Sequence, residues 1–344
     1  MMHANSPTIS TNADSAGSLA SPSARFRTTL QFLVPAVLAA LLIGSTTQQY
    51  HLDLLFQVLL GALLASAWNI VGGYAGQIAL GHAGFYAIGA YTSTILLLRF
   101  GISPWIGMLA GAALAALCAA ILGMLTLRLR GPFFAMSTVA FAEIVRLTAT
   151  HWESVTGGTR GLWISWKPDA WLMGFSDRRA YAFVALGLLV LVTAVSFAIA
   201  RSRLGYLLRA IGSDEDAARS VGVRSSAAKV LAFSISGAFT AMAGTLSAQY
   251  ALSIDPPTFS NFEISIQAAL LSAVGGMGTI AGPIVGAVIM VTTSNLLRST
   301  LGGQFGALHL LIYGVALVLV MLFMRGGIVG LWTRVAKRRH VLKP

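Results

Sequence analysis

Runs of about 20 apolar residues follow one another along most of this chain and constrain its fold more than any other feature. One such run, as an α-helix, crosses the roughly 30 Å hydrocarbon core of a bilayer. Only 10% of the 344 residues are charged and 56% are hydrophobic, whereas soluble proteins carry about 25% charged residues. The candidate spans are 28–46, 54–73, 78–98, 105–127, 131–150, 181–200, 230–252 and 307–324. The pattern predicts an all-α polytopic membrane protein.

One further uncharged stretch, residues 264–297, is too long for a single crossing. As one helix it would reach about 51 Å at 1.5 Å per residue. Its middle, residues 275–283, reads GGMGTIAGP, and glycine and proline break helices. We expect two spans or a broken re-entrant pair, which gives about ten transmembrane helices in all.

The basic residues predict the orientation. With both termini in the cytoplasm, the inner segments hold 16 of the 23 Lys and Arg residues and the outer segments hold 6, as the positive-inside rule requires. The expected organisation is a disordered cytoplasmic tail at 1–27, a transmembrane permease domain at 28–325 with a cytoplasmic loop at 201–229, and a basic cytoplasmic tail at 326–344.

The first apolar run resembles a signal peptide, because Arg25 and Arg27 precede a short hydrophobic segment at 30–44. No small-residue cleavage site clearly follows it, and many further spans do. We interpret it as a retained first helix, with a cleaved signal peptide as the alternative.

The net charge of +12 does not indicate nucleic-acid binding, because the basic residues lie in short loops between apolar runs, as topology signals do. The single cysteine, Cys118, excludes a disulfide framework and a cysteine metal site. We expect neither a metal nor a cofactor.

The polar loop 201–229 contains signals for a short helix. Ser213 is a candidate N-cap, and the acidic residues that follow, including Asp216, fall in the first turn, where the helix dipole favours anions. Gly222 is placed to end the helix in a left-handed conformation, and a second helix is expected from Ser225. A solvated connector that only fixes topology is the plainer interpretation. A connector could be far shorter, however, and a helix–Gly–helix element is suited to docking on a partner.

The segment Asp216-Ala217-Ala218-Arg219-Ser220-Val221-Gly222 resembles the EAA loop of ABC importer permeases. The resemblance implies that this loop inserts into an ATPase subunit and couples hydrolysis to transport. The residues assigned to the coupling loop are Arg209, Ser213, Asp216, Ala217, Ala218 and Gly222.

Other segments narrow the resemblance to the branched-chain amino-acid permeases, and to their M-type subunit. The matching segments are GGYAGQIALGHAGF at 72–85, GAY at 89–91, RGPFFAM at 130–136, TGGTRGL at 156–162 and residues 275–283. Two features depart from the pattern: Arg160, and an N-terminal tail longer than the family core.

This resemblance implies a permease subunit of an ATP-driven importer in the bacterial inner membrane. Its expected partners are ATP-binding subunits, a second homologous permease subunit in a heterodimer, and an extracytoplasmic solute-binding protein. The implied substrate is a branched-chain or related hydrophobic amino acid. Relatives in the same family import urea, amides or aromatic acids, so an importer of other small polar solutes is the alternative.

Two other classes fit the sequence less well. A secondary transporter would need no EAA-like loop. It would be expected to carry several intramembrane carboxylates for ion coupling, and this sequence lacks them. A membrane enzyme would need a nucleophile–base or metal constellation within the bilayer, and none is present. The sequence also lacks a G-x-x-x-x-G-K-[ST] loop, so we expect ATP hydrolysis on separate subunits and no enzyme activity in this chain.

Glycines gather in two segments, 72–89 and 275–286, one in each half of the chain. Paired Gly-interrupted segments indicate a transport path, although glycine also permits close helix packing without any path. The candidates for a translocation path are Gln77, His82, Ser137, Glu143, Gly275 and Gly276.

Two of these candidates have a structural alternative. His82 is an intramembrane ionisable residue, a functional candidate by default, but a buried neutral histidine bonded to a carbonyl fits equally well. Glu143 and Arg146 are three residues apart and are expected to pair, which would lower the cost of holding both charges in the membrane without any substrate contact.

The outer loop 151–180 contains four tryptophans, at positions 152, 163, 166 and 171, among basic residues. An interfacial aromatic belt is one interpretation. A docking surface for the solute-binding protein is the other.

Overall fold

The computed structural model describes residues 37, 39–46, 48–126, 132–301 and the single positions 314, 327, 328 and 330. The expected tail 1–27 lies outside the described residues, as do most of the tail 326–344 and most of spans 28–46 and 307–324.

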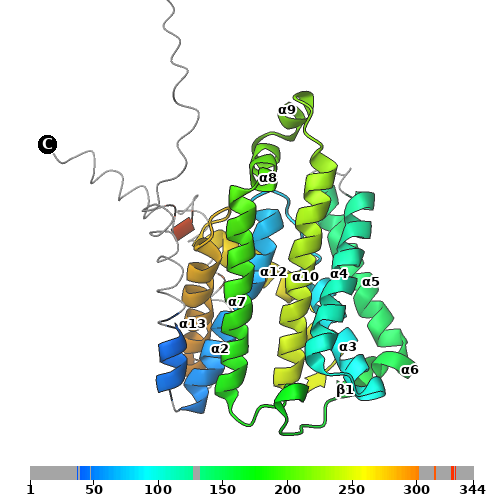
Figure 1. Ribbon diagram of the computed structural model, residues 1–344, viewed down its shortest axis with the longest axis vertical. Helices are drawn as coiled ribbons and strands as arrows, with labels where there is room; N and C mark the ends of the chain where they lie inside the picture. The colour runs from blue at the N-terminus through cyan, green and yellow to red at the C-terminus, as the bar shows by residue number, and fades with distance from the viewer. Residues whose placement is uncertain are drawn as a thin grey trace, which may run out of the picture.

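The described chain is a bundle of long helices that run side by side, with two short helices projecting at one end (Figure 1). The helices are α2 Gln49–Gly72, α3 His82–Phe100, α4 Pro104–Thr126, α5 Pro132–His151, α6 Glu153–Thr156, α7 Arg178–Arg201, α8 Arg203–Ser213, α9 Glu215–Ser220, α10 Ser225–Ala251, α11 Pro256–Phe259, α12 Phe262–Gly275 and α13 Gly282–Leu301. At the opposite end, β1 Leu162–Trp163 pairs antiparallel with β2 Ser253–Ile254.

Within the described residues, the apolar runs are largely helical, as expected. Among the described residues, five helices (α2, α4, α5, α7 and α10) are long and apolar enough to cross a membrane. The expected helical membrane bundle is therefore confirmed, and the count of ten crossings stays a prediction.

The long uncharged stretch splits where its glycines predict. α12 ends at Gly275, and Gly276 adopts a φ of 131° that only glycine enters freely. After the loop 276–281 the chain turns back as α13, which packs against α12. With 14 residues, α12 is only about 21 Å long at 1.5 Å per residue, so α12 alone is shorter than a bilayer core.

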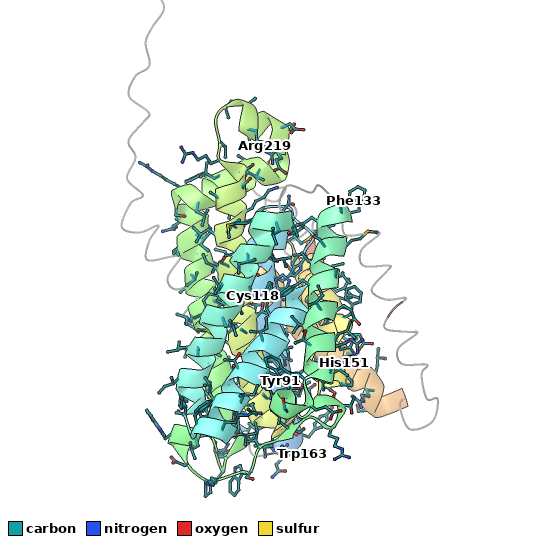
Figure 2. All side chains as sticks on the ribbon, turned by 90° about the vertical axis from the view of Figure 1, so that its right-hand side faces the viewer. Tyr91, Cys118, Phe133, His151, Trp163 and Arg219 are labelled. Atoms are coloured by element: carbon teal, nitrogen blue, oxygen red, sulfur yellow. The ribbon has the colours of Figure 1, made fainter. Side chains whose placement is uncertain are left out.

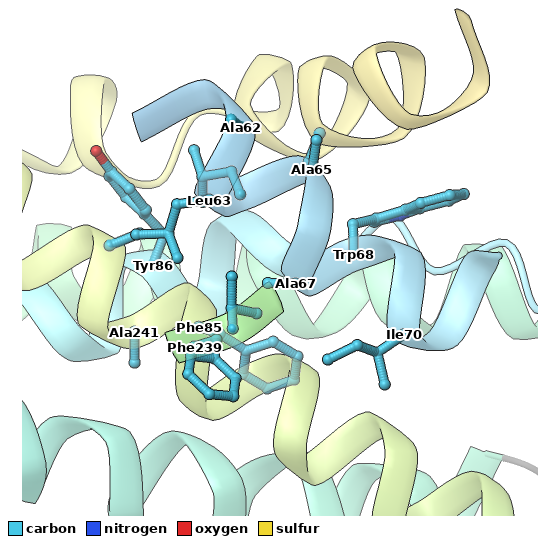
Figure 3. Close-up of a cluster of buried hydrophobic side chains, with 14 of the residues drawn as sticks. Ala62, Leu63, Ala65, Ala67, Trp68, Ile70, Phe85, Tyr86, Phe239 and Ala241 are labelled. Carbon is cyan, nitrogen blue, oxygen red and sulfur yellow. The ribbon is translucent and has the colours of Figure 1, made fainter. Parts of the chain in front are cut away.

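α10 lies at the centre of the bundle and packs against α2, α3 and α4. The core around it is built from buried side chains of α2, α3 and α10, among them Trp68, Phe85 and Phe239 (Figure 3). α4 and α5 lie at the side of the bundle, where many of their large apolar side chains are exposed (Figure 2). In a bilayer these exposed side chains would face lipid or another subunit.

α3 and α10 approach each other through glycines. A Cβ on Gly89 would lie 2.0 Å from the carbonyl oxygen of Ala241, and one on Gly244 would lie 2.0 Å from that of Tyr86. Thr245 also donates its hydroxyl hydrogen to the Gly89 carbonyl at 2.9 Å. Such close backbone approach is typical of helix packing in membranes.

We therefore expect Gly89→Ala to destabilise the bundle by about 1–3 kcal/mol, the usual range for overpacking. The matched control is Gly187→Ala on α7, where a Cβ meets nothing within 4 Å and alanine improves helix propensity. The measurement is the apparent melting temperature of the detergent-solubilised protein. Equal melting temperatures for the two variants would contradict the close α3–α10 contact.

Candidate functional site

α8 and α9 form a compact element, residues 202–224, beyond the end of the bundle where α7 stops and α10 starts (Figure 1). Ser202 caps α8 by accepting a hydrogen bond from the backbone N–H of Gly205 at 3.4 Å. This α8–α9 element contains the segment that resembles the EAA loop. The expected helix–Gly–helix arrangement is present, and both interpretations of the loop stay predictions.

Asp214, not Ser213, caps α9. Its Oδ1 accepts hydrogen bonds from the backbone N–H groups of Asp216 at 2.9 Å and Ala217 at 3.0 Å. The prediction of Ser213 as the cap was wrong, because Ser213 completes the last turn of α8 and the extended backbone comes one residue later. A carboxylate at this position also interacts favourably with the helix dipole.

Gly222 ends α9 as predicted. Its φ is +87°, its N–H bonds to the Arg219 carbonyl at 3.0 Å, and the N–H of Val223 reaches the Ala218 carbonyl at 3.1 Å. These two bonds form a Schellman motif, in which a left-handed residue closes the helix. Nothing lies within 4 Å of a Cβ placed on Gly222, so glycine is required there by the backbone conformation and not by space.

The two adjacent alanines of the EAA-like segment, Ala217 and Ala218, lie in different environments. Ala218 is buried and belongs to the hydrophobic core cluster, whereas Ala217 and Asp216 are exposed. Val221, at the tip, is 78% exposed. α9 thus presents a small apolar surface with an acidic residue beside it, on a helix whose two ends are both capped.

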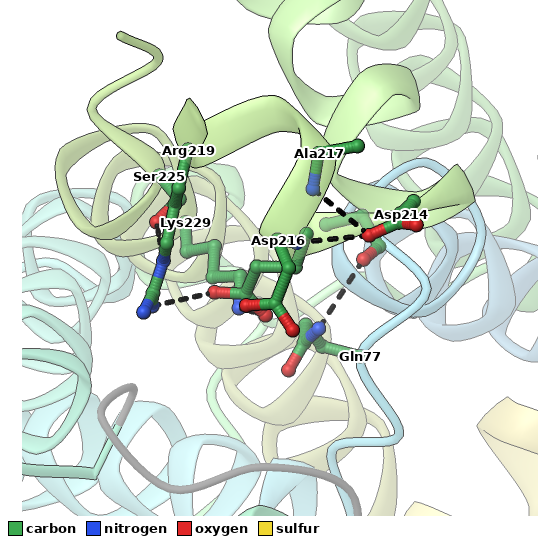
Figure 4. Close-up of polar contacts among 9 residues, drawn as sticks. Gln77, Asp214, Asp216, Ala217, Arg219, Ser225 and Lys229 are labelled. Atoms are coloured by element: carbon green, nitrogen blue, oxygen red, sulfur yellow. Dashed lines mark hydrogen bonds and ion pairs between the residues drawn. The ribbon is translucent and has the colours of Figure 1, made fainter. Parts of the chain in front are cut away.

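An ion-pair cluster fixes α9 to the start of α10 (Figure 4). Lys229, with only 2% of its side chain exposed, donates to Glu215 Oε2 at 2.6 Å. Arg219 donates to the other oxygen of Glu215 at 2.7 Å and to the Ser225 hydroxyl at 2.9 Å. Sequence reasoning missed Glu215, Ser225 and Lys229 as a unit, although a lysine at the entrance of an apolar run was a usable signal.

The protonation state of Glu215 follows from this cluster. Burial acts to raise the pKa of its carboxyl group, but the hydrogen bond and charge of Lys229, together with Arg219, outweigh burial and hold that pKa below its ordinary value. Glu215 is therefore ionised at neutral pH. The nearly buried ammonium of Lys229 has its counter-charge, without which it would be costly to bury.

The α8–α9 element rests on the loop that follows α2. The Cβ of a residue at Gly212 would lie 2.9 Å from the carbonyl oxygen of Tyr74, and one at Gly76 would lie 3.3 Å from the Cα of Gly212. The guanidinium of Arg209 lies 5.9 Å from the centre of the Tyr74 ring, within cation–π range. Burial raises the pKa of Tyr74 to about 12, so the ring is a neutral phenol. Arg209, predicted in the coupling loop, thus holds α8 on the first glycine-rich segment.

The two glycine-rich segments meet at Asn69, a buried residue of α2. Asn69 Nδ2 donates to the Thr279 carbonyl at 2.8 Å, and its Oδ1 accepts from the Gly278 N–H at 2.9 Å and the Ser272 hydroxyl at 3.1 Å. A Cβ on Gly73 would lie 2.5 Å from the Gly278 nitrogen. Sequence reasoning missed Asn69; the signal was an amide close to the glycines that end the apolar run 54–73.

Side chains from other helices satisfy the backbone where α3 begins. Leu80 N–H donates to the Thr138 hydroxyl of α5 at 2.9 Å, and Ala83 N–H donates to the Ser265 hydroxyl of α12 at 2.8 Å. An interrupted helix is tolerated in a membrane only when its freed backbone groups find such partners.

His82 is fully buried at this start of α3. Its Nε2 lies 2.8 Å from the Ser236 hydroxyl, which donates its only hydrogen to the Ala67 carbonyl at 2.6 Å. Because a hydroxyl has one hydrogen, Nε2 is the donor in this contact. Phe85 and Phe233 pack edge-on around this ring. The packing fits the structural interpretation, and a path role for His82 stays a prediction.

The other path candidates do not form one cluster. Gln77 makes only a long 3.4 Å bond to the Ala75 carbonyl, and Ser137 bonds within its own helix to Phe134. Gly275 lies against α13, where a Cβ would meet the Gly282 carbonyl at 1.7 Å. Close packing accounts for Gly275 and the turn conformation for Gly276.

Glu143 and Arg146 pair as predicted, with Arg146 Nε donating to Glu143 Oε2 at 2.8 Å. At the opposite end from α9, the four tryptophans of the outer loop are half or more exposed, from 49% at Trp166 to 76% at Trp163. They remain compatible with both a belt and a docking surface.

The fold and site define a helical membrane protein with interrupted helices and a capped, exposed helix at one end. The chain belongs to the family of branched-chain amino acid transport system permease components, whose match covers residues 50–321. The resemblance noted from the motifs is thereby confirmed.

Three relatives show what the chain is similar to. It is 31% identical over 320 residues to LivM, the high-affinity branched-chain amino acid transport system permease protein of Escherichia coli K12, covering 86% of this chain and 74% of LivM. It is 26% identical over 284 residues to LivH of Salmonella typhimurium, covering 78% and 91% of the two chains. It is 28% identical over 236 residues to LsrC, an autoinducer 2 import system permease of Escherichia coli O9:H4, covering 60% and 67%.

Among solved structures, the PsaBC complex of Streptococcus pneumoniae with a Fab matches at a TM-score of 0.44 and 15% identity, covering 87% of this chain and 95% of that chain. A likeness of this degree is too weak to bear on fold or function.

The position of the cap generates a prediction. We expect Asp214→Ala to destabilise α9 by about 1 kcal/mol, the usual cost of losing an N-cap, while Ser213→Ala leaves α9 unchanged. Hydrogen exchange of the α9 backbone amides measures this local stability. If exchange became faster in Ser213→Ala and stayed unchanged in Asp214→Ala, Ser213 and not Asp214 would be the cap of α9.

Proposed function

We propose that this chain is a membrane-spanning permease subunit of an ATP-driven importer that translocates branched-chain amino acids across a bacterial inner membrane, with both termini in the cytoplasm. The family match over residues 50–321 carries the proposal. The charge distribution of the loops supports the orientation, because it places the α8–α9 element on the cytoplasmic side.

The partner at the cytoplasmic side is an ATP-binding subunit. α9 exposes Asp216 on its surface and has Val221 exposed at its tip. A short exposed helix of this kind can dock into a groove on a partner protein. The Glu215–Lys229 pair supports this role, because a docked helix can move a transmembrane helix only if the two are firmly joined.

A second permease subunit and a solute-binding protein complete the assembly. α5 exposes large apolar side chains, including Phe133 and Ile144, which suits contact with a homologous permease in a heterodimer. At the outer end, exposed aromatic side chains such as Trp163 suit transient contact with a binding protein, since aromatic residues are enriched at protein interfaces.

Uptake assays test the substrate. Cells that express the complete importer should accumulate radiolabelled leucine, isoleucine or valine, and deletion of this chain should abolish the accumulation. Competition with urea, short amides and aromatic acids separates the alternatives within the family. If accumulation follows an ion gradient and persists without ATP-binding subunits, the chain is a secondary transporter and the proposal is wrong.

A variant of Gly222 tests coupling. We expect Gly222→Val to abolish leucine uptake while the protein still reaches the membrane, because a β-branched residue disfavours the φ of +87° that closes α9. Gly222→Asn is the matched control, since asparagine tolerates the left-handed region, and it should retain most uptake. Normal uptake by Gly222→Val would contradict the coupling role.

A further inference from the structure

A half-open surface cavity of about 340 Å³ lies between α5 and residues 257–262, which run from α11 to the start of α12. Its volume is at the lower end of the range of about 300–1,000 Å³ for small-molecule sites, which suits a compact ligand. The lining residues are Val139, Ala142, Glu143, Arg146, Pro257, Ser260, Asn261 and Phe262. The lining therefore brings together one acidic group, one basic group, two neutral polar side chains and four apolar ones.

The charged pair in this lining is placed where a purely structural pair is expensive. Glu143 and Arg146 are in the second half of α5, within the apolar run, and their side chains are 49% and 35% exposed. Charges held in hydrocarbon cost several kcal/mol, and those found within membrane spans generally line a substrate path or face other protein. α5 also lies at the side of the bundle (Figures 1 and 2). This edge of α5 therefore faces water or another subunit and not lipid.

The Glu143–Arg146 pair has hydrogen-bond donors and acceptors that it does not use internally. Arg146 uses Nε and Nη2 on the two oxygens of Glu143, which leaves donors of a guanidinium that has five in all. The Glu143 carboxylate accepts these two bonds and can accept about two more. A ligand with one negative and one positive group can therefore bind beside the pair without breaking it.

Ser260 adds a buried polar residue to the lining of the cavity. It lines the cavity, is 3% exposed, and its Oγ has no hydrogen-bond partner among the described residues. A buried hydroxyl without a partner is costly. Its Oγ is itself covered by protein, so Ser260 shapes the wall beside the charged pair, and the polar contacts to a ligand come from Glu143 and Arg146.

The remaining lining is apolar and matches the rest of such a ligand. Val139 and Ala142 come from α5, while Pro257 and Phe262 come from the facing segment. Phe262 is 41% exposed, so its ring has surface left for an aliphatic group. Polar groups in the cavity would orient the ligand, and the apolar walls would favour a hydrocarbon side chain.

We propose that this cavity is a binding site for the zwitterion of an aliphatic α-amino acid on its way through the permease. Arg146 binds the α-carboxylate, Glu143 binds the α-ammonium, and Val139 and Phe262 contact the side chain. This inference rests on the proposed function and adds the residues that recognise the substrate within the membrane. It also gives the Glu143–Arg146 pair a role beyond mutual neutralisation.

Ligand protection of a cysteine tests the site in the complete importer, purified and placed in lipid nanodiscs. The variant Val139→Cys in a Cys118→Ala background has one thiol in this chain, at the cavity wall. We expect leucine to slow its reaction with a methanethiosulfonate reagent, by roughly tenfold at ten times Kd, because only the unoccupied site reacts. The control is Phe100→Cys, which is 70% exposed at the end of α3 and outside the lining and should not be protected.

The chemistry of recognition is tested with truncated ligands. 4-Methylpentanoate lacks the ammonium group and 3-methylbutan-1-amine lacks the carboxylate, so neither should protect the thiol at Val139→Cys. Glu143→Gln and Arg146→Gln should each abolish protection by leucine. The exchanged pair Glu143→Arg with Arg146→Glu keeps an i,i+3 ion pair and should also lose protection, because the charges are reversed relative to the ligand.

The outcomes separate this inference from the proposed function. If leucine is transported but does not protect the thiol at Val139→Cys, the cavity is not a substrate site and the permease role stands. Full protection in the exchanged variant would leave the pair as a neutralising device and would also overturn the inference. If no branched-chain amino acid is transported at all, the proposed function fails instead.

Discussion

The hydrogen bonds of Asn69 are the interaction on which the rest of this bundle depends. Two helix interruptions lie within the apolar bundle, and hydrocarbon offers no partners to the backbone groups that they free. Asn69 bonds to Gly278 and Thr279 of one interruption and lies one turn before Gly73, where the other begins. One side chain thereby holds both breaks side by side, and the glycines allow the backbones to come close enough for it to do so.

Much of the fold could be predicted from local patterns, because a membrane span is defined by apolar length and a helix break by glycine. The break at 276–281 and the apolar helices followed from those patterns alone. The side chains that bond to the backbone groups freed at the breaks could not be predicted from those patterns. Thr138 and Ser265 are hydroxyl residues in largely apolar helices, and nothing in the neighbouring sequence indicates which distant N–H group each of them accepts.

In the candidate site, too, some features could be predicted from local patterns and others could not. Gly222 could be identified because few residue types adopt a left-handed conformation and glycine does so most readily. The predicted N-cap of α9 was one residue too early because α8 extends to Ser213, which leaves Asp214 as the junction of two helices. The sequence pattern indicates only one helix here. The Glu215–Lys229 pair joins residues 14 apart, beyond the spacings at which helical side chains meet.

These contacts give the α8–α9 element a mechanical consequence. Lys229 joins α9 to α10, and the Gly212–Gly76 contact joins α8 to the loop that begins at Gly73. Gly73 in turn lies against Gly278. A displacement of α9 therefore acts first on α10 and on the two interruptions, which contain the least regular backbone of the bundle. Packed helices resist deformation, so the interruptions, which already lack helical hydrogen bonds, are where the bundle rearranges at least cost.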